Sequence, residues 1–441
     1  MKFSIKIILH TFIWYIAFYF LALGDTFGLY TNFWNFILDN RGEFYSTLLM
    51  SMIAFNILLS CRFYFFERIF SGLDKVYMVH KYTGYFIVLL LILHDALIRG
   101  SRSHITGFFS FAKDVANPLL WLFLIAILVS ALPHIPVVNK LFKIPYHIWK
   151  WTHYIMGVLF LIGIYHSIGV QTMTFSNQTL SWYMYVVYII GTYCFIYKTF
   201  FYNYFKNKYK YFIKDIKNFD QVGVVEILLS PEDINKTIKN KPGQFAFFQF
   251  LEEEVKEIHP FTISNQENEN KEIRLSIKAL GDWTSLLKNK IKINTKVLVD
   301  GPYGYFKSKK SENNLEIWIA GGIGITPFLA MLQDYKKENN LNKNIISVWS
   351  VKDELEAIYK NEIEENLPSN IKFILQDTSK MGYFKFESLL SDIKDNTSTD
   401  SVNKNNISVY ICGPAPMRDG IINDAKNLGI KNFNFEEFSF R

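Results

Sequence analysis

Apolar residues are unevenly distributed along the 441 residues of the chain. Residues 1–205 contain repeated long apolar runs, whereas residues 206–441 are rich in Lys, Asn and Glu and contain only short ones. A helix needs roughly 20 apolar residues to cross the hydrocarbon layer of a bilayer. The long runs predict a membrane α-helical bundle with six spans. We place these spans near residues 4–24, 44–61, 77–98, 116–132, 148–169 and 181–202.

The charges of the connecting loops predict the orientation of this bundle. Loops 62–76 and 133–150 each contain three Lys or Arg residues, whereas loop 170–180 contains no charged residue. Loop 25–43 has one arginine against three acids. Positively charged loops stay in the cytoplasm, so we expect a multi-pass protein with both termini cytoplasmic. The first run begins beside Lys2 and Lys6 and has no small-residue cleavage site, which favours a retained span over a signal peptide.

The polar half shows two successive patterns. Short β-type runs separated by turn residues predict an antiparallel β-barrel over 206–307, and strands alternating with helices predict a doubly wound α/β domain over 308–441. The first domain is therefore 1–205. The expected barrel strands are 222–229, 244–250, 274–278 and 296–299. The expected strands of the α/β domain are 317–320, 345–349, 371–375 and 409–412, with helices at 327–337 and 415–427.

Charge and cysteine content narrow the function classes. The net charge of +7 is modest, and six lysines gather around the end of the last apolar run, as expected beside an anionic membrane surface. No nucleic-acid motif accompanies them, so we expect no nucleic-acid partner. The three cysteines form no CxxC pair, which argues against an iron–sulfur site or a disulfide framework.

Four histidines form two pairs within the apolar runs: His80 and His94 in the third, His153 and His166 in the fifth. Members of a pair lie about 20 Å apart along a helix, which places one near each leaflet. Neutral imidazole is an axial ligand of haem iron. We expect two haem groups, one held by His80 with His153 and the other by His94 with His166. The alternative is that these histidines only form hydrogen bonds between helices.

Helix geometry sets a condition on this arrangement. On an ideal helix His94 lies within about 40° of the face of His80, but His166 lies about 140° from His153. A bulge near Gly157 or Gly163 would correct the second angle. A haem-ligating imidazole also needs an acceptor for its other ring nitrogen.

The polar half contains motifs suited to a flavin. His259, Pro260, Phe261, Thr262, Ile263 and Ser264 end a β-run, where Thr262 and Ser264 could donate to a flavin; the alternative is a plain β-turn. Further on, Lys278 is followed by Gly-Asp-Trp-Thr at 281–284. A cation beside a helix start that Asp282 would cap suits a pyrophosphate.

A glycine loop at 320–328, Ala-Gly-Gly-Ile-Gly-Ile-Thr-Pro-Phe, joins an expected strand to an expected helix. Glycines allow the backbone to approach a dinucleotide phosphate, and the helix N-terminus favours its charge. Cys412, Gly413 and Pro414 follow another strand at the same edge of the sheet. Both segments could also be ordinary strand-to-helix turns.

The ordered motifs HPFTIS (259–264), GDWT (281–284), GPYG (301–304), AGGIGITPF (320–328) and CGPAPM (412–417) resemble the ferredoxin–NADP reductase superfamily. More narrowly, the chain from about residue 44 resembles the flavocytochrome b branch of NADPH oxidases and ferric reductases, especially the bacterial NADPH oxidases. The spacing within both histidine pairs matches the haem ligands of that branch.

The resemblance implies roles for particular residues. FAD would be held by His259, Pro260, Phe261, Thr262 and Ser264, with Lys278, Trp283 and Thr284 near its phosphates. NADPH or NADH would be held by Gly321, Gly322, Gly324, Thr326, Pro327, Cys412, Gly413 and Pro414. Cys412 and Phe440 would be catalytic, Phe440 as the terminal aromatic that covers the flavin.

Two departures from the family pattern keep alternatives open. Lys352 stands where relatives present an arginine to the 2′-phosphate of NADPH, and lysine lacks the bidentate fork. Glu43 lies where animal oxidases carry an arginine associated with oxygen. NADH therefore remains a possible donor, and superoxide formation is less secure than haem reduction.

The function that this set implies is electron transfer from NAD(P)H through FAD and two haem b groups across a bacterial inner membrane. Oxygen, giving superoxide, is the expected acceptor; a ferric or cupric chelate, or a periplasmic partner or quinone, is the alternative. A proton channel that uses the same histidines would leave the flavin and nucleotide motifs without a purpose. The oligomeric state is not indicated.

Overall fold

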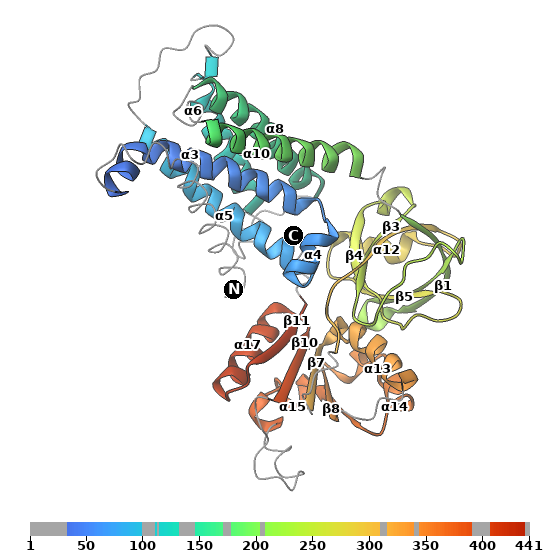
Figure 1. The fold of residues 1–441 in the computed structure, drawn as a ribbon. Helices are drawn as coiled ribbons and strands as arrows, with labels where there is room; N and C mark the ends of the chain where they lie inside the picture. The colour runs from blue at the N-terminus through green and yellow to red at the C-terminus, as the bar shows by residue number, and fades with distance from the viewer. Residues whose placement is uncertain are drawn as a thin grey trace. The chain divides into compact units, whose positions relative to one another are not determined.

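The structure is a computed structural model (Figure 1) that describes residues 33–98, 111–112, 114–131, 146–170, 178–202, 208–308, 315–338, 344–389 and 406–436. Its described side chains exclude those of 33–43, 98, 146 and 147. The described residues form two compact units, one before residue 206 and one from residue 207. Each unit is considered by itself.

The first unit is helical. Its helices are α3 (Phe33–Ser60), α4 (Tyr64–Phe70), α5 (Leu73–Ile98), α6 (Ala116–Ala131), α8 (Tyr146–Gly169) and α10 (Gln178–Ile196), which continues as a π-helix over Tyr197–Phe201. Within the described part of the chain, three helical stretches are long and apolar enough to cross a membrane: Leu73–Leu97, Ile148–Gly169 and Gln178–Phe201. A fourth candidate joins Phe44–Ser60 to Tyr64–Phe70 across a bend of 102°.

The six predicted spans are therefore supported in part. The span predicted at 116–132 corresponds to α6, which is apolar but has only 16 residues. The span predicted at 4–24 lies outside the described residues. Helix α3 already begins at Phe33, within the predicted outer loop 25–43.

Helix packing in this unit depends on glycines that face aromatic rings. A Cβ at Gly157 of α8 would collide with the ring of Phe195 in α10, and a Cβ at Gly191 of α10 would lie 2.6 Å from the ring of Phe160 in α8. Small residues let helices approach closely in this way. The outer surface is apolar as well, since Trp121, Trp151 and Trp182 are each more than 60% exposed. A helix bundle that is apolar outside as well as inside suits a lipid environment.

The second unit begins with a six-stranded antiparallel sheet in the order β4-β3-β6-β1-β2-β5. Its end strands β4 and β5 also contact each other, so the sheet forms the predicted barrel. Its strands are β1 (Tyr209–Phe219), β2 (Val224–Pro231), β3 (Phe245–Phe250), β4 (Ile258–Thr262), β5 (Ile273–Lys278) and β6 (Lys296–Tyr303), with helix α12 (Asp282–Lys290) after β5. The prediction omitted β1. A bulge between Ile213 and Asp215 interrupts the alternation of apolar and polar residues there, and the lysines of this strand lie within the basic cluster.

The rest of the second unit is a five-stranded parallel sheet in the order β11-β10-β7-β8-β9. Its strands are β7 (Leu315–Gly321), β8 (Asn344–Val351), β9 (Ile371–Asp377), β10 (Ile407–Cys412) and β11 (Asn432–Phe435). Helix α13 (Thr326–Glu338) packs on one face, and α17 (Ala415–Asn427) packs on the other, as Figure 1 shows. The predicted doubly wound fold is thus present, with β11 as a strand that the prediction omitted.

The strand order reverses between β7 and β10, because the chain proceeds from β7 to β8 and β9 on one side and returns to β10 and β11 on the other. Ligands of open α/β sheets bind at such a switch point, outside the carboxyl ends of the strands. The glycine loop follows β7 and the Cys-Gly-Pro segment follows β10. The topology therefore brings these two predicted motifs together.

Candidate active site

The glycine loop and the Cys-Gly-Pro turn pack against each other through their backbones. A Cβ at Gly324 would collide with the carbonyl oxygen of Cys412, and a Cβ at Gly413 would lie 3.1 Å from the backbone of Gly321. Neither position can accept a larger residue without displacing main chain. The two segments therefore form one surface at the switch point.

Gly322 lies on the open side of this surface. Its φ is +52°, in the left-handed region that favours glycine, and nothing lies within 4 Å of a Cβ built there. Its carbonyl accepts a hydrogen bond of 2.8 Å from the buried indole of Trp349. Thr326 begins α13 and Pro327 follows it, directly after the 3-10 helix Gly322–Ile325, in which the Thr326 N–H donates to the carbonyl of Ile323. The positive end of this helical segment lies beside the loop. This is a suitable arrangement for an anionic dinucleotide.

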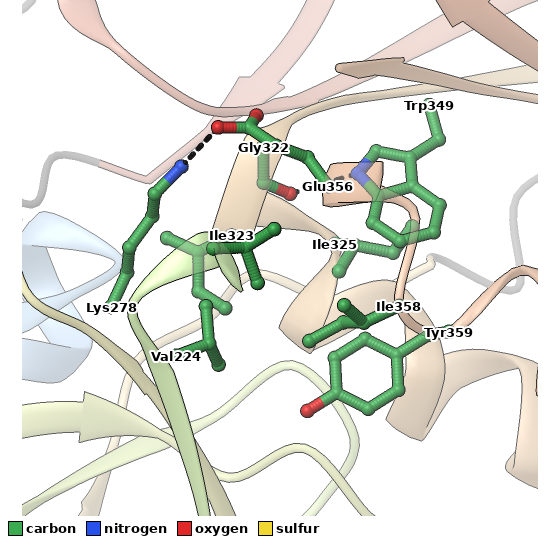
Figure 2. Close-up of a pocket in the computed structure, with 10 residues that line it drawn as sticks. Val224, Lys278, Gly322, Ile323, Ile325, Trp349, Glu356, Ile358 and Tyr359 are labelled. Carbon is green, nitrogen blue, oxygen red and sulfur yellow. Dashed lines mark hydrogen bonds and ion pairs between the residues drawn. The ribbon is translucent and has the colours of Figure 1, made fainter. Parts of the chain in front are cut away.

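A small cavity of about 10 Å³ lies beside the loop (Figure 2). The barrel contributes Val222, Val224 and Lys278 to its lining, and the α/β domain contributes Gly322, Ile323, Ile325, Trp349, Glu356, Ile358 and Tyr359. The Lys278 ammonium and the Glu356 carboxylate form an ion pair of 2.7 Å across the domain junction. The cavity is thus apolar, with one ion pair at its margin.

A second ion pair joins the same barrel strand to the α/β domain. Arg274 of β5 donates from both terminal nitrogens to the two carboxylate oxygens of Glu362, each at 2.9 Å. Burial disfavours the charged form of the Arg274 guanidinium and would lower its pKa. The hydrogen bonds and the charge of Glu362 outweigh burial, so the pKa of Arg274 is raised. Sequence reasoning missed this pair, because 88 residues separate its members.

The predicted flavin motif lies on β4 and at the turn after it. The His259 ring stacks on the Trp283 indole with ring centroids 4.0 Å apart, and Phe261 stacks on the same indole at 6.0 Å. His259 Nε2 also lies 3.0 Å from the carboxylate of Glu257. Pro260 pairs with Phe247 of the neighbouring strand. The structure therefore brings the HPFTIS and GDWT motifs into contact.

The hydroxyl groups of this region have local partners. Ser264 is fully buried and donates to the carbonyl of Arg274 at 2.9 Å. Thr262 is buried at the end of β4. The Thr284 hydroxyl accepts from the backbone N–H groups of Leu280 and Gly281, each at 3.0 Å. Gly281 is the N-cap of α12 and Asp282 is its first residue, so the predicted capping role of Asp282 is wrong.

The remaining predicted residues are dispersed. Lys352 is exposed just after β8, and Phe440 lies outside the described residues. Cys412 is fully buried at the end of β10, followed by Gly413 and Pro414, the N-cap of α17. Burial, together with the Glu436 carboxylate, raises the pKa of the Cys412 thiol.

Glu436 is a residue that the sequence analysis missed. It follows β11, is 3% exposed, and lies near Cys412 and the Gly304 turn. A buried carboxylate at the ligand edge of a parallel sheet is a candidate functional group. The sequence signalled it only by its position two residues before the end of the stretch 432–438, in which apolar and acidic residues are mixed, and this position indicates no chemistry by itself.

The helical unit brings His80 and His153 together. Their ring centroids lie 5.9 Å apart. His80 Nδ1 donates to the carbonyl of Asn56 at 3.0 Å, and His153 Nδ1 lies 3.2 Å from the Ser130 hydroxyl. The His153 ring is also stacked on Trp149 at 5.1 Å. Both rings are therefore oriented through Nδ1, and donation to a carbonyl puts the proton of the His80 ring on Nδ1, which makes its Nε2 the basic nitrogen.

His166 has the same kind of anchor. Its Nδ1 donates to the carbonyl of Ala112 at 2.6 Å. A carbonyl can only accept, so Nδ1 carries the proton and Nε2 is the basic nitrogen. Helix α8 runs without a bulge from Tyr146 to Gly169. A bulge near Gly157 or Gly163 is therefore absent from this helix, while local rewinding there, the other expected correction, stays a prediction; His153 and His166 contact different neighbours.

Comparison with known proteins identifies the second unit. Residues 224–348 match an FAD-binding domain family, and residues 318–422 match an oxidoreductase NAD-binding domain family. The second unit therefore carries a match to an FAD-binding domain followed by a match to an oxidoreductase NAD-binding domain. The chain is 26% identical over 170 residues to dual oxidase 2 of Rattus norvegicus, a match that covers 33% of this chain and 11% of that protein.

Other proteins are also similar to part of the chain. Ferric reduction oxidase 7, chloroplastic, of Arabidopsis thaliana is 29% identical over 163 residues, covering 31% of this chain and 21% of that protein. The flavohaem-like FAD/NAD-binding domain of nitric oxide dioxygenase from Vibrio cholerae O1 biovar El Tor has 18% identity and a TM-score of 0.44, covering 52% of this chain and 98% of that one. The chain thus spans only a small part of the first two relatives.

Proposed function

We propose that this chain is a transmembrane NAD(P)H oxidase that passes electrons from NAD(P)H, through FAD and two haem b groups, to an acceptor across a membrane. The observation that carries this proposal is the facing pair of His80 and His153 on apolar helices, in a chain with FAD- and NAD-binding domains. A soluble reductase would have no use for such a pair.

The geometry of this pair suits axial ligation of one haem iron. Metal–imidazole bonds of about 2 Å on both sides of a metal leave two ring centroids about 6 Å apart, and the observed separation is 5.9 Å. The Nδ1 anchors orient the rings and raise the basicity of Nε2. Within the described residues no cluster of three or more His, Cys, Asp or Glu offers another metal site. We assign the second haem to His94 and His166, where His166 has an Nδ1 anchor of the same kind.

The residues of the second unit bind and orient the electron donor. Gly321, Gly322, Gly324, Thr326 and Pro327 would hold the dinucleotide at the switch point, with Gly413 and Pro414 on the opposite side. FAD supplies the chemistry that converts a two-electron donor into single electrons. In this proposal the residues that hold it are His259, Pro260, Phe261, Thr262, Ser264, Trp283 and Thr284.

Two residues are proposed to act at the donor–flavin contact. Cys412 lies at the carboxyl end of β10, where its buried, protonated thiol can order a nicotinamide without acting as a nucleophile. Phe440 is proposed to cover the flavin ring, as the family resemblance implies. The exposed Lys352 after β8 is the proposed partner of the adenosine 2′-phosphate, a weaker selector for NADPH than arginine.

The proposed acceptor is oxygen, which would give superoxide. His80 with His153, and His94 with His166, would hold the two haem groups, which would supply one-electron transfer to this acceptor. A ferric or cupric chelate is the second candidate acceptor, favoured by the similarity to a ferric reduction oxidase. The proposed site is a bacterial inner membrane with both termini cytoplasmic, and the proposed domains are 1–205, 206–307 and 308–441.

Two measurements test the proposal. A dithionite-reduced spectrum of the purified protein should show b-type haem bands with two haems per chain, and their absence would refute the haem assignment. NAD(P)H-driven cytochrome c reduction should be sensitive to superoxide dismutase if oxygen is the acceptor. Activity that is insensitive to the dismutase but proportional to ferric chelate would favour the metal reductase.

A further inference from the structure

Lys278 was expected near the flavin phosphates, but its ammonium lies at the margin of the cavity beside the glycine loop (Figure 2). There it donates to Glu356 at 2.7 Å, and the two side chains are only 22% and 20% exposed. Lys278 is the last residue of β5, and Glu356 belongs to the segment that follows β8. A cation of the barrel is thus paired with an anion of the α/β domain, directly beside the proposed dinucleotide surface.

The Glu356 carboxylate is ionised at neutral pH. Partial burial would raise the pKa of this carboxyl, but the hydrogen bond and charge of Lys278 outweigh burial and hold it below the ordinary value. Its second oxygen accepts from the backbone N–H of Lys352 at 3.3 Å. The Glu356 carboxylate is therefore an anion of the protein itself, and it is paired with the Lys278 ammonium at this cavity.

The cavity cannot hold a nicotinamide while the pair is in place. Its volume of about 10 Å³ is room for one water molecule. The open backbone of Gly322 forms one wall, and Val224, Ile323 and Ile358 form apolar walls. A dinucleotide at this position must separate Lys278 from Glu356, and its phosphate can take the place of the carboxylate as the partner of the ammonium.

We propose that Glu356 is a gate for the nicotinamide dinucleotide: it holds Lys278 until a dinucleotide phosphate replaces it. Glu356 then turns away, and the junction between barrel and α/β domain opens at the glycine loop. The inference rests on NAD(P)H being the electron donor. The Glu356 carboxylate competes with the nucleotide phosphate for Lys278. This competition lowers the apparent affinity for the nucleotide, because only the molecules in which the ion pair is separated can bind it.

The same strand provides a matched control. Arg274 lies four residues before Lys278 on β5 and is paired with Glu362 at 2.9 Å, again across the domain junction. Neither Arg274 nor Glu362 lines the cavity. Removing Glu362 therefore weakens the junction without freeing a cation for the nucleotide.

The experiment is calorimetric titration of the intact flavoprotein with NADP⁺ and NAD⁺. Glu356→Gln should lower the dissociation constant about tenfold, as expected if roughly nine molecules in ten have the pair closed. Lys278→Met should raise it about tenfold or more, and the double variant should behave like Lys278→Met. Glu362→Gln should leave it within about twofold.

Several results would overturn the gate. One is an unchanged or larger dissociation constant in Glu356→Gln. Another is loss of FAD from Lys278→Met with unchanged NADP⁺ affinity, which would show that Lys278 binds the flavin and not the nucleotide. If Glu356→Gln does not fold, Glu356→Asp retains the charge with a shorter reach and should tighten binding by a smaller factor; weaker binding again refutes the gate. Anaerobic flavin reduction by NAD(P)H in the unmodified protein separates the two proposals, because its failure removes the donor and not the gate alone.

Discussion

The two regions proposed to carry electrons are built in opposite ways. At the nucleotide edge, Gly324 and Gly413 allow two turns to meet through their backbones, and few side chains contribute. In the helical unit, the backbone is regular and the site consists of imidazoles whose Nδ1 atoms are anchored to Asn56, Ser130 and Ala112. The first site should therefore be sensitive to added volume, and the second to lost hydrogen-bonding and ligating groups.

The largest expected effect comes from removing a ligand in the helical unit. His80→Ala should remove about half of the haem and abolish transfer to the external acceptor, because His153 alone cannot provide both axial bonds. Flavin reduction by NAD(P)H should remain within about twofold of the unmodified rate. Haem content by the pyridine haemochrome method and anaerobic stopped-flow measure the two effects. Thr152→Ala, beside His153, is the control and should retain the full haem content.

The converse substitution adds one methyl group at the nucleotide edge. Gly324→Ala should destabilise the α/β domain by about 1–3 kcal/mol, because the new Cβ collides with the main chain of Cys412. NADP⁺ binding should weaken more than tenfold, while the haem bands remain. Gly420→Ala is the control, since nothing lies within 4 Å of a Cβ there; in helix α17 it should stabilise by about 0.5–1 kcal/mol. Equal effects of the two substitutions would contradict the backbone account.

The same difference explains what the sequence could predict. The glycine loop and the Cys-Gly-Pro turn are continuous segments whose chemistry is local, and the strand order that joins them follows from strand–helix alternation. The histidine spacing was equally visible. By contrast, Lys278 and Glu356 are 78 residues apart, and only the packing of the barrel on the α/β domain brings them together. The anchors of the histidines depend in the same way on tertiary structure.

Strand β1 shows a second limit. Its lysines suggested a basic segment beside the membrane, and its bulge between Ile213 and Asp215 breaks the two-residue period on which a strand prediction depends. The buried face of this strand, which includes Tyr211 and Ile213, nevertheless lies in the barrel core. A pattern that changes register within eleven residues cannot be recognised without its neighbours β2 and β6.

A smaller effect is expected when an anchor is removed and the ligand is left in place. Ser130→Ala deletes the hydroxyl that lies 3.2 Å from His153 Nδ1. Both haems should remain, and one midpoint potential should move by some tens of millivolts, because the imidazole loses orientation and basicity. A spectroscopic redox titration measures this change. Ser167→Ala, whose hydroxyl is bonded to Tyr188 instead of a histidine, should leave both potentials unchanged; a similar shift in both variants would show a general packing effect.

The smallest expected effect is the pH response of the ion pair between Lys278 and Glu356. Lys278 holds the pKa of Glu356 below its ordinary value, despite partial burial that acts in the opposite direction. A carboxylate with a depressed folded-state pKa stabilises the fold above its unfolded pKa of about 4.3, and this stabilisation is lost as pH falls through the folded pKa. Glu356→Gln should therefore cost about 1 kcal/mol at neutral pH, and the difference from the unmodified protein should vanish in acid. Chemical unfolding from pH 7 to about pH 3 measures it. If the difference in the free energy of unfolding persists in acid, Glu356 stabilises the protein through packing and not through its charge. The nucleotide edge would then depend on the fit of its backbone and side chains alone.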